Sequence, residues 1–144
     1  MIYKDIPENF NPRHEAVGCF CQLEGKMLLL LRQDWLPEGN KWGAPGGKID
    51  PEDKTPVYAA RRELWEETGI LLPEDNFIPF CKFYVRYPDY DFTYEMFSIE
   101  LEKPEAVIVT PKEHKGFYWA RPHTSLKMRL VLGMDECIRQ FYRL

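Results

Sequence analysis

Three glutamates and two arginines lie close together in the segment ARRELWEETGI. Glu63, Glu66 and Glu67 are three and four residues apart, which places them on one side of a helix. Like charges at this spacing repel each other, and on an ordinary solvated helix face Arg61 and Arg62 would compensate for them. The alternative is that the carboxylates gather around a hard divalent cation such as Mg²⁺, which prefers oxygen ligands.

The apolar positions of the same helix bear on this choice. They are Val57, Ala60 and Leu64, which follow one another at intervals of three and four residues and predict the face that contacts the core. The three glutamates lie beside this stripe, with Glu67 nearest to the core, then Glu63, then Glu66. Carboxylates that converge at the edge of a core are costly unless a positive group joins them, which favours the cation.

The flanking residues predict where this helix begins and ends and what precedes it. Thr55 and Pro56 are a helix cap and a first helical residue, and the helix is expected to reach about Thr68, with Gly69 as a left-handed cap. Before it, residues 34–56 form a long segment rich in Gly, Pro, Asn and Asp, a length that usually indicates function. Its Gly-Gly pair allows a sharp turn or a close approach to a ligand, although a plain turn would use the same residues.

Together, the stretch GGKIDPEDKTPVYAARRELWEETGI resembles the signature of the Nudix hydrolases, G-x5-E-x7-R-E-U-x-E-E-x-G-U, where U is a bulky aliphatic residue. Gly47 fits the opening glycine, and RELWEETGI fits every fixed position of the second half. The middle departs from the pattern, because the position of the first glutamate holds Asp53 and one extra residue follows. In the family this glutamate braces the loop by pairing with the signature arginine, here Arg62; Asp53 and Glu52 are the two candidates.

The resemblance implies an α/β fold, specifically an α/β/α sandwich with a mixed central sheet, the loop–helix–loop signature and a C-terminal helix. It also implies hydrolysis of a nucleoside diphosphate linked to another group, by water attack on phosphorus with Mg²⁺ or Mn²⁺. Metal ions would neutralise the anionic bridge and lower the pKa of the attacking water. The alternative is a non-catalytic nucleotide sensor on the same fold, for which three metal-site glutamates would have no use.

Matching positions carry the family's roles onto this chain. Glu66 and Glu67 resemble the principal metal ligands, Glu63 a further ligand or the base, and Gly46 a ligand through its carbonyl. Arg62 resembles the bracing arginine, which we group with the catalytic residues. Many relatives use a further glutamate from a late loop, and the stretch TPKEHKGFYWA offers Glu113 as the base or an additional ligand. The neighbouring His114 is expected to be a bystander.

Substrate contacts are predicted less specifically. Arg32, at the end of LLLLR, and Lys48 are candidates for phosphate, since a bidentate arginine suits phosphate oxygens. Trp35 and Tyr87 are candidates for stacking on a base or sugar, as are Tyr84 and Phe92. Tyr87 lies seventeen residues past the signature, where dinucleoside polyphosphate hydrolases tend to carry a tyrosine, and no proline stands where ADP-ribose hydrolases carry one. Nucleoside triphosphates and nucleotide sugars are the other possible substrates.

The remaining elements must position this helix. We expect a hairpin formed by HEAVGCFCQLE and KMLLLLRQ, two further strands in FIPFCKFYVRY and DFTYEMFSIEL, and a short strand GFYWA. Residues 125–144 are predicted to be one amphipathic helix, with Gly133 as its weak point. Residues 1–13 are expected to be a loose lead-in to a single domain over residues 1–144.

The composition of the whole chain excludes some classes of binding partner. With a formal net charge of -4 and no basic stripe, the chain is not expected to bind duplex nucleic acid. Its four cysteines form no CxxC pair, and its longest apolar run, MLLLL, is too short to cross a membrane. No signal peptide is visible, so we expect a cytoplasmic protein with a small nucleotide substrate. The resemblance alone suggests a homodimer.

Overall fold

The computed structural model describes residues 1–144, and one mixed sheet of eight strands dominates it. The strands are β1 (Ile2–Tyr3), β2 (Pro12–Leu23), β3 (Lys26–Arg32), β4 (Trp42–Gly43), β5 (Gly46–Lys48), β6 (Ile78–Arg86), β7 (Asp91–Glu100) and β8 (His114–Ala120). Their order is β1-β6-β7-β2-β3-β4, while β5 also pairs with β2 and β8 with β3. The long strands β2 and β7 run parallel and every other pair is antiparallel.

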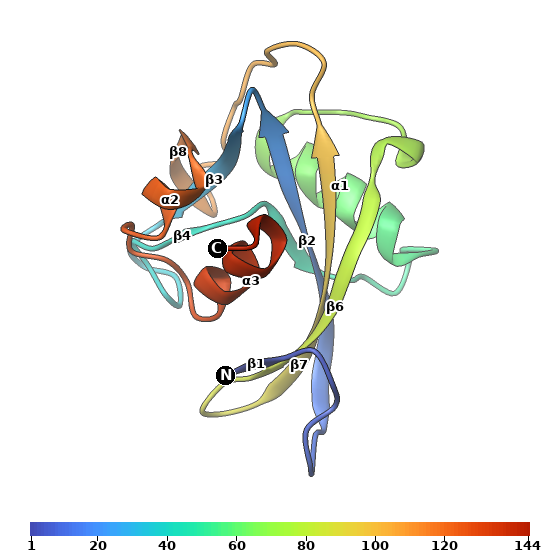
Figure 1. Ribbon diagram of the computed structural model, residues 1–144. Helices are drawn as coiled ribbons and strands as arrows, with labels where there is room; N and C mark the ends of the chain where they lie inside the picture. Colours follow the sequence, from blue (N-terminus) through green and yellow to red (C-terminus); the bar gives the residue numbers. More distant parts are fainter.

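Both faces of this sheet are covered, as Figure 1 shows, by helix α1 (Pro56–Thr68) on one side and α3 (Met134–Tyr142) on the other. Alternation along β2 explains the two layers, because successive side chains of a strand point to opposite faces. Val17, Cys19 and Cys21 join the core under α1, and Phe20 joins the core under α3. The predicted α/β/α sandwich with a mixed sheet is therefore confirmed.

Local sequence signals set the bounds of α1 as predicted. The Thr55 side chain accepts a hydrogen bond from the Tyr58 N–H, Pro56 is the first helical residue, and Gly69 takes a φ of 79° at the end of the helix. Gly69 tolerates this left-handed conformation because it has no Cβ. The apolar stripe points inward, with Ala60 and Leu64 buried against the sheet. The glutamates beside it are thereby held at the margin of the core.

The terminal helix is shorter than predicted. In the C-terminal segment only α2 (Pro122–Ser125) and α3 are helical. Gly133 takes a φ of 85° before α3, and the chain that precedes it pairs with β4 instead of forming a helix. The Trp42 N–H donates to the Arg129 carbonyl, and the Val131 N–H donates to the Trp42 carbonyl. Backbone pairing with a strand far away in the sequence replaces the helical bonds that the apolar periodicity predicted.

Two other expectations about local structure differ from the structure. Ile2 and Tyr3 form β1, which pairs with β6, and β2 already begins at Pro12, so the expected loose lead-in contributes to the sheet at both of its ends. Residues 34–56 are not one continuous loop, since they contain β4 and β5. All four cysteines are free thiols, and Cys19, Cys21 and Cys137 are buried. No helix is long and apolar enough to span a membrane.

Candidate active site

Glu67 is fixed at the centre of the site by the strand that precedes the helix. Its side chain is only 4% exposed, and its Oε1 accepts a hydrogen bond of 2.8 Å from the Gly46 N–H. Gly46 is in β5, opposite Gly18 of β2, at a point where any Cβ would lie 2.2 Å from the Val17 carbonyl oxygen. The glycine thus lets β5 pack directly on β2, and this packing brings its backbone to Glu67.

Glu63 is held against the next glycine. A Cβ built on Gly47 would lie 2.7 Å from the Glu63 carboxylate carbon and 2.8 Å from each carboxylate oxygen. The same carboxylate accepts a 2.9 Å hydrogen bond from Arg62. Only a glycine at position 47 therefore lets the Glu63 carboxylate come so close to the backbone. The carboxylate lies between the Gly47 backbone and the Arg62 guanidinium.

Arg62 connects the loop to the helix. Its Nε and Nη2 donate to the two oxygens of Asp53 at 2.9 and 2.8 Å, and its Nη1 donates to Glu63 and, at 3.1 Å, to Glu66. The Asp53 side chain is 2% exposed, and hydrogen bonding from Arg62 lowers the pKa of its carboxyl group. Of the two candidates for the brace, Asp53 occupies this position, whereas Glu52 is exposed.

Burial raises the pKa values of the inner carboxyl groups. Desolvation brings the pKa of Glu63 to about 7, with nearby Glu66 and Glu113 adding repulsion and Arg62 opposing it. Desolvation also raises the pKa of Glu67 well above its usual value, and the Glu63 charge adds to this. The exposure of the three helix glutamates follows the order predicted: Glu67 is buried, Glu63 half-buried and Glu66 exposed. Such a donor set fits a divalent cation, which would favour the ionised form of each carboxylate.

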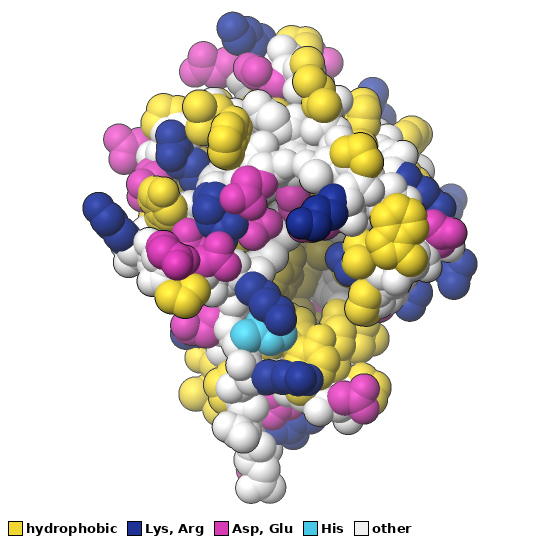
Figure 2. Space-filling view, turned by 180° about the vertical axis from the view of Figure 1, so that it is seen from behind, with side chains coloured by type: hydrophobic (Ala, Val, Ile, Leu, Met, Phe, Trp, Pro, Cys, Tyr) yellow, Lys and Arg dark blue, Asp and Glu magenta, His cyan; other side chains and the backbone are white.

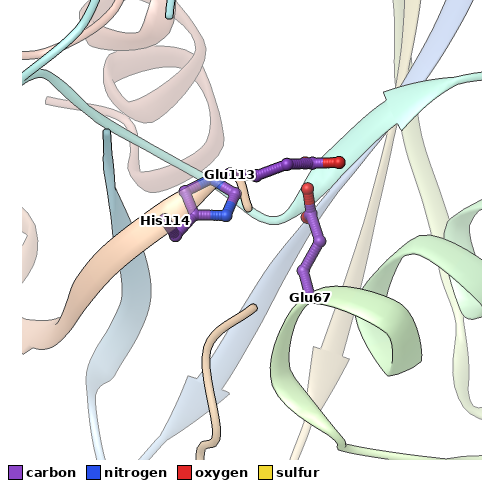
Figure 3. A group of neighbouring side chains, drawn as sticks. All are labelled: Glu67, Glu113 and His114. Carbon is purple, nitrogen blue, oxygen red and sulfur yellow. The ribbon is translucent and has the colours of Figure 1, made fainter. Parts of the chain in front are cut away.

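A late loop brings two more side chains to Glu67 (Figure 3). Glu113 is the last residue of the loop and His114 is the first residue of β8, and both side chains point toward Glu67 of α1. One ligand atom from each of the three residues lies within 4.8 Å of the others. Glu113 is exposed, whereas His114 is 5% exposed and its Nδ1 is buried without a hydrogen-bond partner. The late-loop glutamate is thus at the site, and the histidine that we expected to be a bystander faces it.

Glu67 lines a cleft between the sheet and the segment that leads into α3. Polar lining comes from Glu67, Arg32 and His114, and apolar lining from residues including Val85, Phe92 and Met134. Its cavity volume is about 160 Å³, below the ~300–1,000 Å³ of a typical small-molecule pocket. Figure 2 shows a hollow on this face, with charged side chains around its rim and hydrophobic atoms within and below it, in keeping with this mixed lining.

Only some of the predicted substrate-binding residues line the cleft. Arg32 and Tyr87 both line the cleft, and Arg32 Nε donates to the Pro37 carbonyl at 2.8 Å. Lys48 and Trp35 do not line the cleft; Lys48 is exposed, and the Trp35 side chain is 67% exposed. The Trp35 side chain therefore lies outside the lining of the cleft in this structure.

Two residues at the cleft were not singled out from the sequence. Glu38 accepts hydrogen bonds of 2.7 Å from the Tyr87 hydroxyl and from the Leu132 N–H, and so ties three segments together at the rim. Tyr94 lines the cleft and crosses β2 where Gly18 leaves room for its hydroxyl. The sequence carries no local signal for Glu38, since its two partners lie 49 and 94 residues away. Alternation along β7 placed Tyr94 on the same face as Phe92, which is a signal that could have been used.

Comparisons with known proteins agree with this geometry. The NUDIX domain family model matches residues 12–141. The phosphatase NudJ of Escherichia coli K12 is 38% identical over 95 residues, which are 65% of this chain and 58% of that protein. The chain therefore spans less than two thirds of the length of these curated relatives.

Solved structures share the fold. A MutT NUDIX hydrolase from Burkholderia pseudomallei is 25% identical with a TM-score of 0.75, covering 88% of this chain and 96% of that one. The NUDIX domain of Shewanella oneidensis NrtR, solved in complex with ADP ribose, is 21% identical with a TM-score of 0.79, covering 95% of this chain and 91% of that one. At this low identity the second likeness concerns the fold alone.

Proposed function

This chain belongs to the Nudix family, and we propose from that premise that it is a metal-dependent hydrolase of nucleoside diphosphate derivatives. The observation that carries the proposal is Glu67, buried at 4% exposure, fixed by the Gly46 N–H and facing Glu113 at the mouth of a cleft. A buried carboxylate beside other carboxylates is costly in a purely structural role. It is useful where a cation must be held against a diphosphate.

The proposed ligands are Glu63, Glu66 and Glu67, with the Gly46 carbonyl and Mg²⁺ or Mn²⁺ as the ion. When bound, such an ion would neutralise phosphate oxygens and lower the pKa of a water molecule. Glu66 is the outermost of the three carboxylates, held by Arg62 at 3.1 Å, and would join the ion by a change of rotamer.

The chain's own residues supply positioning and proton transfer. Arg32 lines the cleft, and its guanidinium would bind the substrate's phosphate oxygens. Glu63 or Glu113 would accept the proton of the attacking water, because a general base must lie within reach of the proton that it removes. Arg62 would keep the loop and helix in register through Asp53, so that these groups hold their places.

The substrate is proposed as a small nucleotide with a phosphoanhydride bond. The apolar end of the cleft, with Tyr87 and Phe92, would take a ring, and the polar end would take the phosphates. Nucleoside triphosphates, dinucleoside polyphosphates and nucleotide sugars all have this form, as does the ADP ribose bound by NrtR. A single domain over residues 1–144, a homodimer and a cytoplasmic location stay proposals; sedimentation analysis would test the second.

Substitution of the central carboxylate tests the proposal. Glu67→Gln keeps the size of the side chain and removes its charge, and we expect kcat to fall by a factor of about 10³ or more with Mg²⁺ and a panel of nucleotides. Glu102→Gln, at an exposed position away from the site, is the matched control and should match the wild type. Full turnover by Glu67→Gln would refute the assignment. Nucleotide binding without turnover by the wild type would instead favour the sensor.

A further inference from the structure

His114 is a buried side chain that the proposed mechanism leaves without a role. Its ring is 5% exposed, it makes no hydrogen bond through its side chain, and its Nδ1 is enclosed. Buried polar atoms are nearly always paired, so an unpaired ring nitrogen calls for a partner other than protein.

The surroundings of the ring indicate the kind of partner. One imidazole nitrogen and one oxygen from each of Glu67 and Glu113 lie within 4.8 Å of one another, and all three side chains point toward a common space (Figure 3). Ligand atoms on a single transition-metal ion, each about 2.0–2.2 Å from it, stand roughly 3–4 Å apart, so small rotamer changes would complete such a site. The backbone of His114 is fixed in β8 opposite Arg32, which holds the ring at this place.

We propose that His114 is a nitrogen ligand of the metal ion at this site, together with Glu67 and Glu113. The proposal rests on the metal-dependent function proposed above and adds to it a specific consequence for metal choice. A site made only of carboxylate and carbonyl oxygens suits Mg²⁺, whereas an imidazole ligand favours later transition-metal ions such as Co²⁺ and Zn²⁺. The chain should therefore bind these ions far better than an all-oxygen site would, relative to Mg²⁺.

A contact between His114 and the substrate is the main competing explanation. The ring also lines the cleft, where a base or phosphate could reach it. That explanation predicts no nitrogen signal on the bound ion in the absence of nucleotide, and no change in metal affinity when the histidine is replaced. Metal binding without substrate therefore separates the two.

Electron spin echo spectroscopy of the full chain loaded with Mn²⁺ alone gives the direct readout. We expect modulation from a directly bound ¹⁴N nucleus, which should disappear when the protein is labelled with ¹⁵N-histidine. This measurement uses only the wild-type protein and needs no variant to fold. Absence of a nitrogen coupling from the Mn²⁺ that occupies the site would overturn the proposal.

Calorimetric titration with Co²⁺ and Mg²⁺ gives the second readout. In His114→Gln we expect Co²⁺ affinity to fall by about tenfold or more, with Mg²⁺ affinity changing much less. His123→Gln, at an exposed histidine remote from the glutamates, is the matched control and should bind both ions as the wild type does. An unchanged Co²⁺ affinity in folded His114→Gln would contradict the proposal.

Glu67→Gln distinguishes this inference from the proposed function. If Glu67→Gln loses Mn²⁺ while the wild type shows no nitrogen coupling, the metal site stands and the histidine ligand is refuted. If Glu67→Gln binds Mn²⁺ as tightly as the wild type does, the proposed metal site itself is wrong and the histidine ligand fails with it.

Discussion

Replacing Gly47 by alanine would disturb the proposed active site through a single carbon atom. The added Cβ would lie 2.7 Å from the Glu63 carboxylate carbon and 2.8 Å from both of its oxygens, whereas ordinary van der Waals contact begins at 3.4 Å. The carboxylate must therefore retreat by more than half an ångström or rotate away. It cannot retreat freely, because Arg62 donates to it at 2.9 Å and is itself held by Asp53.

The expected magnitude follows from the sensitivity of catalysis to position. A misplacement of about 1 Å in a catalytic group can lower the rate by about 10²-fold. We therefore expect Gly47→Ala to lower kcat/KM by about 10²-fold. The cost to stability should be about 1–3 kcal/mol for overpacking, which is less than the total stability of a typical domain, so the protein should stay folded.

Steady-state kinetics with Mg²⁺ and the best substrate of the panel, beside a thermal unfolding curve, would measure both effects. Gly116→Ala is the matched control, because a Cβ at Gly116 would meet only a Leu31 side-chain carbon at 4.0 Å. The control should retain wild-type kinetics. If Gly47→Ala were as active as Gly116→Ala, the position of Glu63 would not matter to the reaction, contrary to the role proposed for it.

Three other predictions follow from contacts of the site. Asp53→Asn should lower the free energy of unfolding by about 2 kcal/mol, because it weakens the two hydrogen bonds that the Asp53 carboxylate accepts from Arg62. Substitution of the exposed Glu52 by Gln should leave that free energy unchanged, and chemical denaturation would compare the two variants. Because the folded state raises the pKa of Glu63 from 4.5 to about 7, the metal-free protein should lose stability as pH rises through that range, and Mg²⁺ should raise the melting temperature more at pH 8 than at pH 5. Glu38→Ala leaves a hydroxyl and a backbone N–H at the cleft rim without their acceptor, so KM should rise several-fold and the unfolding free energy should fall by about 1–3 kcal/mol, as kinetics and denaturation would show.

The signature helix shows how much the sequence can determine. Its cap at Thr55, its end at Gly69 and the graded burial of its glutamates all match the prediction. These features depend on residues within a few positions of one another, through a fixed helical period and the conformations that Thr, Pro and Gly allow. Neighbouring residues are enough to specify them.

The terminal segment shows where such reasoning fails. The stripe of Leu126, Leu130 and Ile138 does contact the core beneath α3, as its periodicity indicated. The helix nevertheless begins only at Met134, because β4 offers the preceding backbone a partner that the helical pattern could not anticipate. Periodicity predicted which side chains are buried but not the backbone conformation that buries them.

By itself, the sequence determined the acidic helix and the glycines before it, because spacing along the chain fixes the face that each side chain takes. The α/β/α class came from the resemblance to the Nudix signature. Only the tertiary structure decided that Asp53 rather than Glu52 holds Arg62 and that His114 faces Glu67. It also decided that Trp35 stands outside the cleft. These outcomes depend on how β5, β8 and the loops pack against α1, and packing joins residues whose separation along the chain carries no signal of their contact.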